Sequence, residues 1–195
     1  MVFDPESVEK LNRDLRKASA TLSPEEARYF VDMYYSWQED RKRSNNQVRA
    51  LSTSDQARDL GADEEPHEVI RWLADQSALL EKNILAALQV YADSHPVGRW
   101  MQSVVGIGPV ISAGLLAAID IKQAPTVGHI WRFAGLDPTV TWNKGEKRPW
   151  NARLKTLCYK IGESFVKVSN NPNDVYGKVY VARKELEIAR NDAGQ

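Results

Sequence analysis

The amino-acid sequence predicts an all-α fold, in which a long helical hairpin at the N-terminus precedes a smaller helical domain. Apolar residues recur at helical spacing along most of the chain, and helix-start signals precede several of these stretches, such as the Ser-Pro-Glu-Glu segment at 23–26. The 195 residues, of which 43% are hydrophobic and 27% charged, suit one globular domain or two small ones. The single cysteine, Cys158, excludes a disulfide scaffold.

The N-terminal part of the chain is expected to form three helices. A short helix covers residues 4–18, and two long helices cover 24–51 and 65–91, with a polar connection over 52–61. The long helices carry apolar stripes at Ala27, Phe30, Tyr34, Trp37, Val48 and Leu51, and at Val69, Trp72, Leu73, Leu80, Ile84, Leu88 and Tyr91. We interpret them as an antiparallel hairpin, although such faces also suit dimerisation.

A change in composition near residue 94 divides the chain into an acidic helical region, residues 1–94, and a basic region, residues 95–195. Residues 1–98 carry 18 acids and 12 bases, a net charge of −6, whereas residues 99–195 carry 8 acids and 14 bases, a net charge of +6. Such a split favours an anionic partner for the basic region. The alternative is that the two halves attract each other.

The most informative stretch, residues 100–119, predicts a short helix, a Gly-containing turn and a second helix with small residues on its packing face. In the turn, Gly106 and Gly108 permit a close approach to a phosphate, and Ile107 anchors the turn to the helices beneath it. Pro109 suits the first helical turn, where the free N–H groups near Val110 can hold a phosphate oxygen. This helix-hairpin-helix pattern predicts contacts to a nucleic-acid backbone rather than to bases.

A second candidate surface follows a helix that Gly135 is expected to end. Residues 139–150 alternate in polarity and then turn, so they form either a loop or a small β-hairpin. The candidate contacts in and after this segment are Lys144, Lys147, Arg148, Trp150 and Arg153, together with Trp142. Cations can pair with phosphates while indoles stack on bases or sugars. The alternative is a solvated turn whose tryptophans fold into the core.

Two further helices are expected towards the C-terminus. The first covers residues 151–168, and we expect its apolar face to point inward, with Leu154, Leu157, Cys158, Ile161, Phe165 and Val168 on it. The last helix carries Val175, Val179, Ala182, Leu186 and Ala189 at helical spacing.

Residues from about 100 to 190 resemble the C-terminal domain of the DEDD-type insertion-sequence transposases, the group that includes the Piv DNA invertase. Three blocks in order carry the resemblance: 105–109 (Val-Gly-Ile-Gly-Pro) with the Ala-rich helix after it, 133–138 (Phe-Ala-Gly-Leu-Asp-Pro), and the basic helix from 151 (Asn-Ala-Arg-Leu) that leads to Asn171-Pro172 and Tyr176. The resemblance implies an α-helical DNA-binding domain used in recombination, often in multimers.

Catalysis does not follow from this resemblance. Members of the group carry an N-terminal nuclease-like domain with four acidic residues on a β-sheet, whereas residues 1–94 read as helical throughout. The group also places a serine just after the Ala-Gly-Leu-x-Pro block, where this chain has Thr139 and Thr141. We therefore assign no catalytic residue. Three functions stay open: a DNA-binding protein of a mobile element or phage, a recombinase-type or base-excision-type enzyme, and a protein-interaction module with a purely structural hairpin.

No cofactor or metal site is expected. His67, His95 and His129 lie far apart in the sequence, and no phosphate-loop or dinucleotide fingerprint occurs. The uncharged run over 104–119 is short and broken by glycines for a membrane span, and the N-terminus does not read as a signal peptide. We expect a soluble cytoplasmic protein, in the form of a homodimer, whose partner is duplex or branched DNA or a structured RNA.

Overall fold

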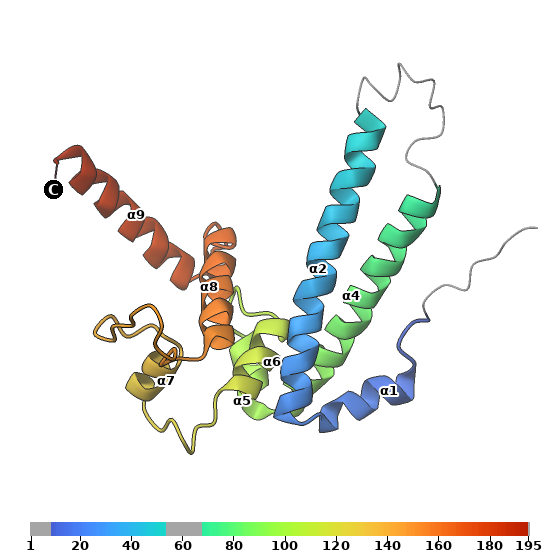
Figure 1. Cartoon of the computed structure of the whole chain (residues 1–195), viewed down its shortest axis with the longest axis horizontal. Helices are drawn as coiled ribbons and strands as arrows, with labels where there is room; N and C mark the ends of the chain where they lie inside the picture. The colour runs from blue at the N-terminus through green and yellow to red at the C-terminus, as the bar shows by residue number, and fades with distance from the viewer. Residues whose placement is uncertain (1–8, 54–67, 195) are drawn as a thin grey trace, which may run out of the picture.

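The computed structural model describes residues 9–53 and 68–194, and all regular secondary structure within them is helical, as the sequence predicts (Figure 1). The helices are α1 (Arg13–Ala18), the 3-10 turn η1 (Ser19–Thr21), α2 (Pro24–Thr53), α4 (Glu68–Ser94), α5 (Pro96–Gln102), α6 (Pro109–Ala118), α7 (Val127–Phe133), α8 (Ala152–Lys167) and α9 (Tyr176–Asp192). Among these described residues, none of the helices combines the length and the apolarity that crossing a membrane requires.

The predicted helical hairpin is present, because α2 and α4 run antiparallel side by side (Figure 1). The start of α2 is set by a capping box, in which the Glu26 amide donates to the Ser23 hydroxyl and the Ser23 amide donates to the Glu26 carboxylate. These hydrogen bonds hold the pKa of Glu26 below its ordinary value. The predicted start of this helix at Pro24 is therefore confirmed.

A polar pair explains why the apolar stripe of α2 is interrupted at Arg41. The guanidinium forms an ion pair with Glu81 of α4, whose side chain is largely buried between the two helices. A buried carboxylate is stable only with such a partner, since its desolvation must be offset. The pair also fixes the register of α2 against α4. Apolar contacts between two helices specify their register less strictly than a buried polar pair does.

The main core joins both halves of the sequence. Its buried members come from α2 (Ala27 and Val31), α4 (Ile84, Leu88, Tyr91 and Ala92) and α6 (Val110, Ala113 and Ala117). A second cluster of Ile111, Ala134, Leu154 and Leu157 attaches α8 to the other side of α6. The face of α6 that packs against α8 carries small residues because larger ones would not fit. A Cβ atom on Gly114 would lie 2.8 Å from the Leu157 side chain. The domain division near residue 94 stays a prediction.

The first predicted helix is wrong at its start within the described residues. Residues 9–12 are not helical, and Asn12 caps α1 by accepting a hydrogen bond from the Leu15 amide. The preceding backbone is held instead by Asn83 of α4, which accepts from the Leu11 amide and donates to the Glu9 carbonyl. The predicted start at residue 4, the connection after residue 53 and the predicted start of the second long helix at residue 65 lie outside the described residues.

The C-terminal helices follow the predicted ranges, but the last one extends away from the body (Figure 1). The carboxylate of Asp174, 2% exposed, accepts hydrogen bonds from the amides of Gly177 and Lys178 at the start of α9. A Cβ atom on Gly177 would lie 2.4 Å from the Phe165 carbonyl oxygen, so this position requires glycine. The apolar stripe of this helix is exposed from its N-cap, Val175 (64%), through Val179 (63%) to Leu186 (51%).

Candidate nucleic-acid interface

The hairpin turn, residues 103–108, connects α5 to α6 and is held by α8. Gly106 has a φ of +98°, and a Cβ atom there would lie 2.8 Å from the ring of Phe165. The Gly106 carbonyl accepts a hydrogen bond of 2.6 Å from the Ser164 hydroxyl. Ile107 packs against the second core cluster, as the sequence predicts. The turn is therefore built into the packed body of the protein.

The N-terminal end of α6 is the part of this turn that can contact a phosphate. Gly108 caps the helix with extended backbone, and no heavy atom lies within 4 Å of where its Cβ atom would be. Pro109 has no N–H group, so the first free donors are the amides of Val110 and Ile111. The side chain of Val110 belongs to the main core, so that only its backbone is available for binding.

These amides open onto a groove of about 500 Å³ between α2 and α8. Its charged lining is mixed, with Lys42, Lys160 and Lys167 beside Glu39 and Glu163. Lys42 is paired with Glu39 at 2.8 Å, and the Lys160 ammonium lies 4.4 Å from the centre of the Tyr35 ring. Burial raises the pKa of Tyr35 to about 12, so its phenol stays protonated and neutral at physiological pH. The groove is thus only weakly cationic.

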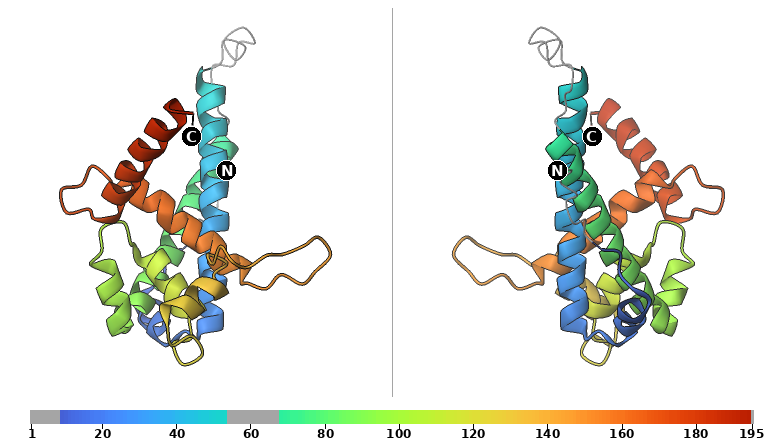
Figure 2. Two further views of the ribbon diagram at one scale, coloured as in Figure 1. Left: turned by 90° about the vertical axis from the view of Figure 1, so that its left-hand side faces the viewer. Right: turned by 90° about the vertical axis from the view of Figure 1, so that its right-hand side faces the viewer.

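The tryptophan loop, residues 135–151, connects α7 to α8 and projects from the body (Figure 2). Of the two alternatives for residues 139–150, the loop is confirmed and the small β-hairpin is not, because these residues contain turns and no strand. The loop is closed at its base by a 2.8 Å hydrogen bond from the Asn151 amide to the Phe133 carbonyl. Inside it, the indole N–H of Trp142 donates to the Glu146 carbonyl and satisfies the turn. These hydrogen bonds take the place of a strand ladder.

The tryptophans of this loop pack on each other and belong to neither core cluster. The rings of Trp142 and Trp150 meet edge to face with centroids 5.9 Å apart, and Trp142 is 41% exposed. The Arg148 guanidinium lies 5.2 Å from the centre of the Trp142 ring, and the Lys155 ammonium lies 4.6 Å from the Trp150 ring. Aromatic faces attract such cations without neutralising them, so their charge stays available to a ligand.

Three cations of the loop, at Lys144, Lys147 and Arg148, are exposed. In the described part of the chain, no carboxylate forms an ion pair with any of the three. Arg153 differs from them. It lies in the first turn of α8 on the side that faces α2, where its guanidinium pairs with Asp32 at 3.2 Å. Arg153 is therefore not brought together with the loop cations, contrary to the grouping expected from the sequence.

The hairpin turn and the tryptophan loop contact opposite ends of α8. Gly106 packs near Phe165 at the C-terminal end, while the loop leads directly into the N-terminal end. Sixteen helical residues separate those ends by about 24 Å, at 1.5 Å per residue. In Figure 2 the two segments also lie on opposite sides of the molecule. The hairpin turn and the tryptophan loop therefore do not lie on one flat surface.

The first threonine after the Ala-Gly-Leu-Asp-Pro block is held by the aspartate of that block. The Thr139 hydroxyl donates a 2.7 Å hydrogen bond to the Asp137 carboxylate, which also accepts from the Thr139 amide. These hydrogen bonds hold the pKa of Asp137 below its ordinary value, which makes the carboxylate a weaker base. Across the described residues, no cluster of three or more His, Cys, Asp or Glu side chains is arranged to hold a metal ion.

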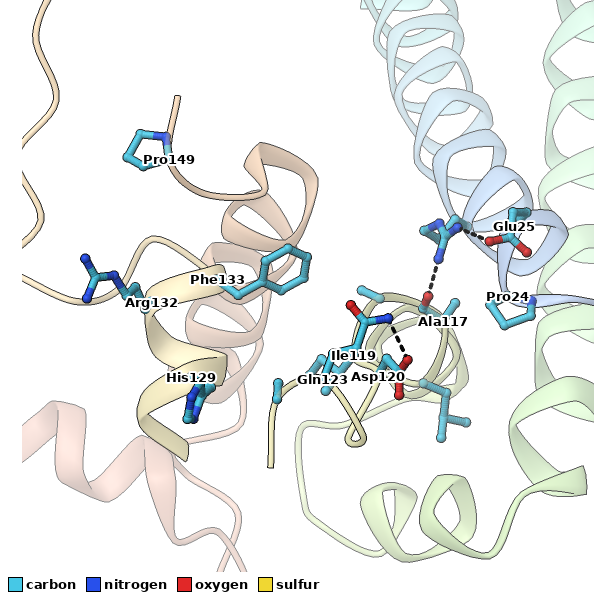
Figure 3. A pocket seen from close by; sticks show the side chains of 14 residues that line it. Pro24, Glu25, Ala117, Ile119, Asp120, Gln123, His129, Arg132, Phe133 and Pro149 are labelled. Atoms are coloured by element: carbon cyan, nitrogen blue, oxygen red, sulfur yellow. Dashed lines mark hydrogen bonds and ion pairs between the residues drawn. The ribbon is translucent and has the colours of Figure 1, made fainter. Parts of the chain in front are cut away.

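A cavity of about 760 Å³ lies between the start of α2, the end of α6 and α7, and the sequence did not point to it (Figure 3). Phe133, His129 and Arg132 line it from α7, and Asp120 and Gln123 line it from the segment after α6. Phe133 carries a large apolar side chain, yet it is 42% exposed. The sequence does not indicate which apolar residues stay exposed, so an exposed aromatic ring near cationic side chains is found only in the folded structure.

Comparison with known proteins gives one match. Residues 98–164, about a third of the chain, match the model of the IS116/IS110/IS902 transposase family. No curated protein and no solved structure matches the chain. The matched segment contains the hairpin turn, α6, α7, the tryptophan loop and most of α8. The match supports a transposase-family domain over these residues, a role in the transposition of a mobile element, and DNA as the partner.

Proposed function

We propose that this protein binds the DNA backbone, largely without regard to sequence, in the transposition or recombination of a mobile element or phage, and that it has no catalytic site of its own. The observation that carries the proposal is the tryptophan loop, where Lys144, Lys147 and Arg148 are exposed beside two packed indoles. Backbone-directed binding needs cations that reach phosphates, and aromatic rings add stacking that tolerates any base.

The hairpin turn is proposed as a second, weaker contact of the helix-hairpin-helix type. The amides of Val110 and Ile111 at the start of α6 are suited to a phosphate oxygen, because helix N-termini favour anions. The mixed charge of the groove around them supports a weaker role than that of the loop. In the DEDD-type transposases that the sequence resembles, the corresponding domain serves recombination, which agrees with this assignment.

The acidic α2–α4 hairpin is proposed to mediate dimerisation or to recruit a partner protein. Its support is the exposure of Leu73 (50%) and Trp72 (36%) on α4, away from the main core. Apolar side chains exposed on a long helical arm are typical of helix-to-helix contacts. Sedimentation of the purified protein over a range of concentrations tests this part separately from DNA binding.

The central test is a salt titration of binding to duplex, four-way-junction and single-stranded DNA and to a structured RNA. The variant Lys144→Ala/Lys147→Ala/Arg148→Ala should weaken duplex binding and reduce the slope of log affinity against log salt by about 2.7, at roughly 0.9 per lost phosphate contact. The matched control is Arg13→Ala/Arg16→Ala/Lys17→Ala, which removes three exposed charges from α1, on the far side of the molecule (Figure 1). That control should leave the slope unchanged.

Equal slopes for the two triple variants would contradict the role of the loop. Magnesium is included and the products are run on a gel, so that cleavage or joining of DNA would contradict the non-catalytic part of the proposal. A protein without measurable affinity for any of these nucleic acids at low salt would instead be an interaction module with a structural hairpin turn.

A further inference from the structure

We infer that the cavity beside α7 receives an unpaired nucleotide of the bound DNA, with its base against Phe133 and its phosphate near Arg132. The inference rests on the proposed function, since the nucleotide belongs to the DNA that the tryptophan loop holds. It adds a preference for DNA that contains an unpaired base, which backbone contacts alone would not give.

The walls of the cavity suit a flat, largely apolar ring. The Phe133 ring extends from α7 toward α6, where Ile119 lies on the opposite side (Figure 3). Its volume of about 760 Å³ lies within the range of small-molecule sites. An aromatic ring exposed to water at 42% gains from being covered by a base, because stacking removes apolar area from both partners.

The charges around the cavity are arranged so that a cation is left for the ligand. On the α6 side, Asp120 accepts hydrogen bonds of 2.9 Å from the Lys122 amide and the Gln123 side chain. Arg28 is likewise engaged, since it donates to the Ala117 carbonyl and pairs with Glu25 at 2.7 Å. The polar side chains of that wall are therefore engaged in hydrogen bonds and an ion pair within the chain itself.

The α7 side is different, because Arg132 forms no direct ion pair with a carboxylate among the described residues, and its charge acts on Asp137 only by helping to lower the pKa of that carboxyl. His129 stands one helical turn earlier on the same wall, with its Nδ1 atom 2.6 Å from the Thr126 hydroxyl. Arg132 and Phe133 follow each other in α7, and their side chains extend from the helix in different directions (Figure 3). An arginine that binds phosphate and an aromatic ring that stacks on a base are the combination that single-stranded nucleic acid requires.

The cavity is also continuous with the proposed DNA-binding loop. Pro149, near the end of the tryptophan loop, forms part of its rim, and the hydrogen bond from Asn151 to Phe133 ties the loop base to α7. A strand whose phosphates lie on Lys147 and Arg148 therefore passes beside the opening. This path makes an extruded nucleotide of that strand the expected occupant.

The experiment uses two duplexes that share one strand containing 2-aminopurine, a fluorescent base that is quenched by stacking. In one duplex this base is unpaired as a single bulge, and in the other it is paired. The unmodified protein should bind the bulged duplex more tightly and change its fluorescence. Phe133→Leu should weaken binding of the bulged duplex by about 5- to 160-fold, the range for losing one stacked base, and abolish the fluorescence change. Binding of the paired duplex should stay the same.

Two control variants separate stacking from general effects. Phe133→Tyr keeps an aromatic ring and should restore both the preference and the fluorescence change. Trp131→Leu removes an aromatic ring of α7 that is 54% exposed but does not line the cavity, so the preference for the bulge should survive. Circular dichroism of each variant checks that the helical fold is retained.

If the unmodified protein binds both duplexes equally and leaves the fluorescence unchanged, the inference is wrong while the proposed function stands. If it binds neither duplex, the proposed function fails and the inference fails with it. Binding of the free 2-aminopurine deoxynucleotide is measured as a third experiment. Phe133-dependent binding of the free nucleotide without any preference for the bulge would assign the cavity to a small molecule and overturn the inference.

Discussion

The hairpin turn and the tryptophan loop lie at the two ends of α8, and contacts of different kinds hold them. The hairpin turn depends on residues distant in sequence, because Ser164 and Phe165 of α8 fix Gly106. The tryptophan loop depends mainly on itself, through the contact of Trp142 with Trp150 and the turn around Glu146. The hairpin turn is therefore packed into the body of the protein, whereas the tryptophan loop lies outside both core clusters, and we expect it to change its conformation without unfolding the protein.

This difference has a consequence for recognition. A turn built into the core presents its amides in one geometry and suits a ligand of one shape, such as a single phosphate. A self-supported loop with exposed cations adapts to the variable path of a nucleic-acid backbone, at the cost of ordering its side chains on binding. The comparison predicts that mutations in the first region act mainly on folding and mutations in the second act mainly on binding.

The largest expected effect comes from Gly106→Ala. The positive φ costs a non-glycine residue about 1–2 kcal/mol, and the close contact with Phe165 adds about 1–3 kcal/mol of overpacking. Urea unfolding followed by circular dichroism should show a loss of about 3 kcal/mol. The matched control is Gly145→Ala in the tryptophan loop, which has a φ of +95° but open space around it, and it should cost about 1 kcal/mol. Similar losses at both positions would remove the distinction between the two turns.

The next effect is expected from Ser164→Ala, which deletes the hydrogen bond to the Gly106 carbonyl. Leaving a partly buried carbonyl without a donor should lower the free energy of unfolding by about 1–2 kcal/mol. Thr156→Ala removes a similar hydroxyl from the exposed face of the same helix, where it bonds only to the Ala152 carbonyl, and should cost less than about 0.5 kcal/mol. An equally small loss for Ser164→Ala would mean that α8 does not hold the hairpin turn.

A smaller effect on folding is expected from Trp142→Leu. It removes the contact with Trp150, the cation–π contact with Arg148 and the indole hydrogen bond to the Glu146 carbonyl, which together are worth about 1.5 kcal/mol within the loop. Because the loop belongs to neither core cluster, the unfolding free energy should change by less than this, while the near-ultraviolet circular dichroism of the paired indoles is lost. Destabilisation of several kcal/mol would show that the loop is part of the core.

The smallest effect is expected from protonation of Asp137. The hydrogen bonds from Thr139 lower the pKa of Asp137 in the folded protein. The ionised carboxylate therefore stabilises the turn fully at pH values above its ordinary pKa, and this stabilisation is lost as the pH falls through the lowered pKa. Thr139→Val should raise the pKa toward the ordinary value, because it removes the hydroxyl and keeps the amide. Carbon-detected NMR titration of the Asp137 carboxyl measures both values. An unchanged pKa in the variant would exclude the hydroxyl as the cause.

Several elements of this fold were predictable because local chemistry decides them. Ser23 accepts a hydrogen bond from the Glu26 amide in the first turn of α2, and the sequence places the start of α2 correctly on that basis. Asn151 caps α8 in the same way, by accepting from the Leu154 amide. The inward face of α8 was also predictable, since Leu154 and Leu157 are buried at helical spacing.

Other features depend on residues that are distant in the sequence. Nothing near Arg41 indicates that Glu81, 40 residues later, is its partner, and nothing near Arg153 indicates that it turns toward Asp32. The alternation over 139–150 suggested a β-hairpin, but the indoles pack on each other within turns and form no ladder. For the candidate site, the hairpin turn and the loop cations were found from the sequence, and their separation along α8 was not.

Because α9 is anchored at its base, a small rotation there produces a larger displacement of its free end. Its base is held by the Asp174 carboxylate and by the close contact of Gly177 with the Phe165 carbonyl, and α8 is its neighbour in the body. Seventeen residues give an arm of about 25 Å, so a rotation of about 10° at the base moves the free end by about 4 Å. The Phe165 ring packs against Tyr176 at the start of α9, with centroids 4.8 Å apart, and also against Gly106, so a shift of that one ring would link the position of the arm to the state of the hairpin turn.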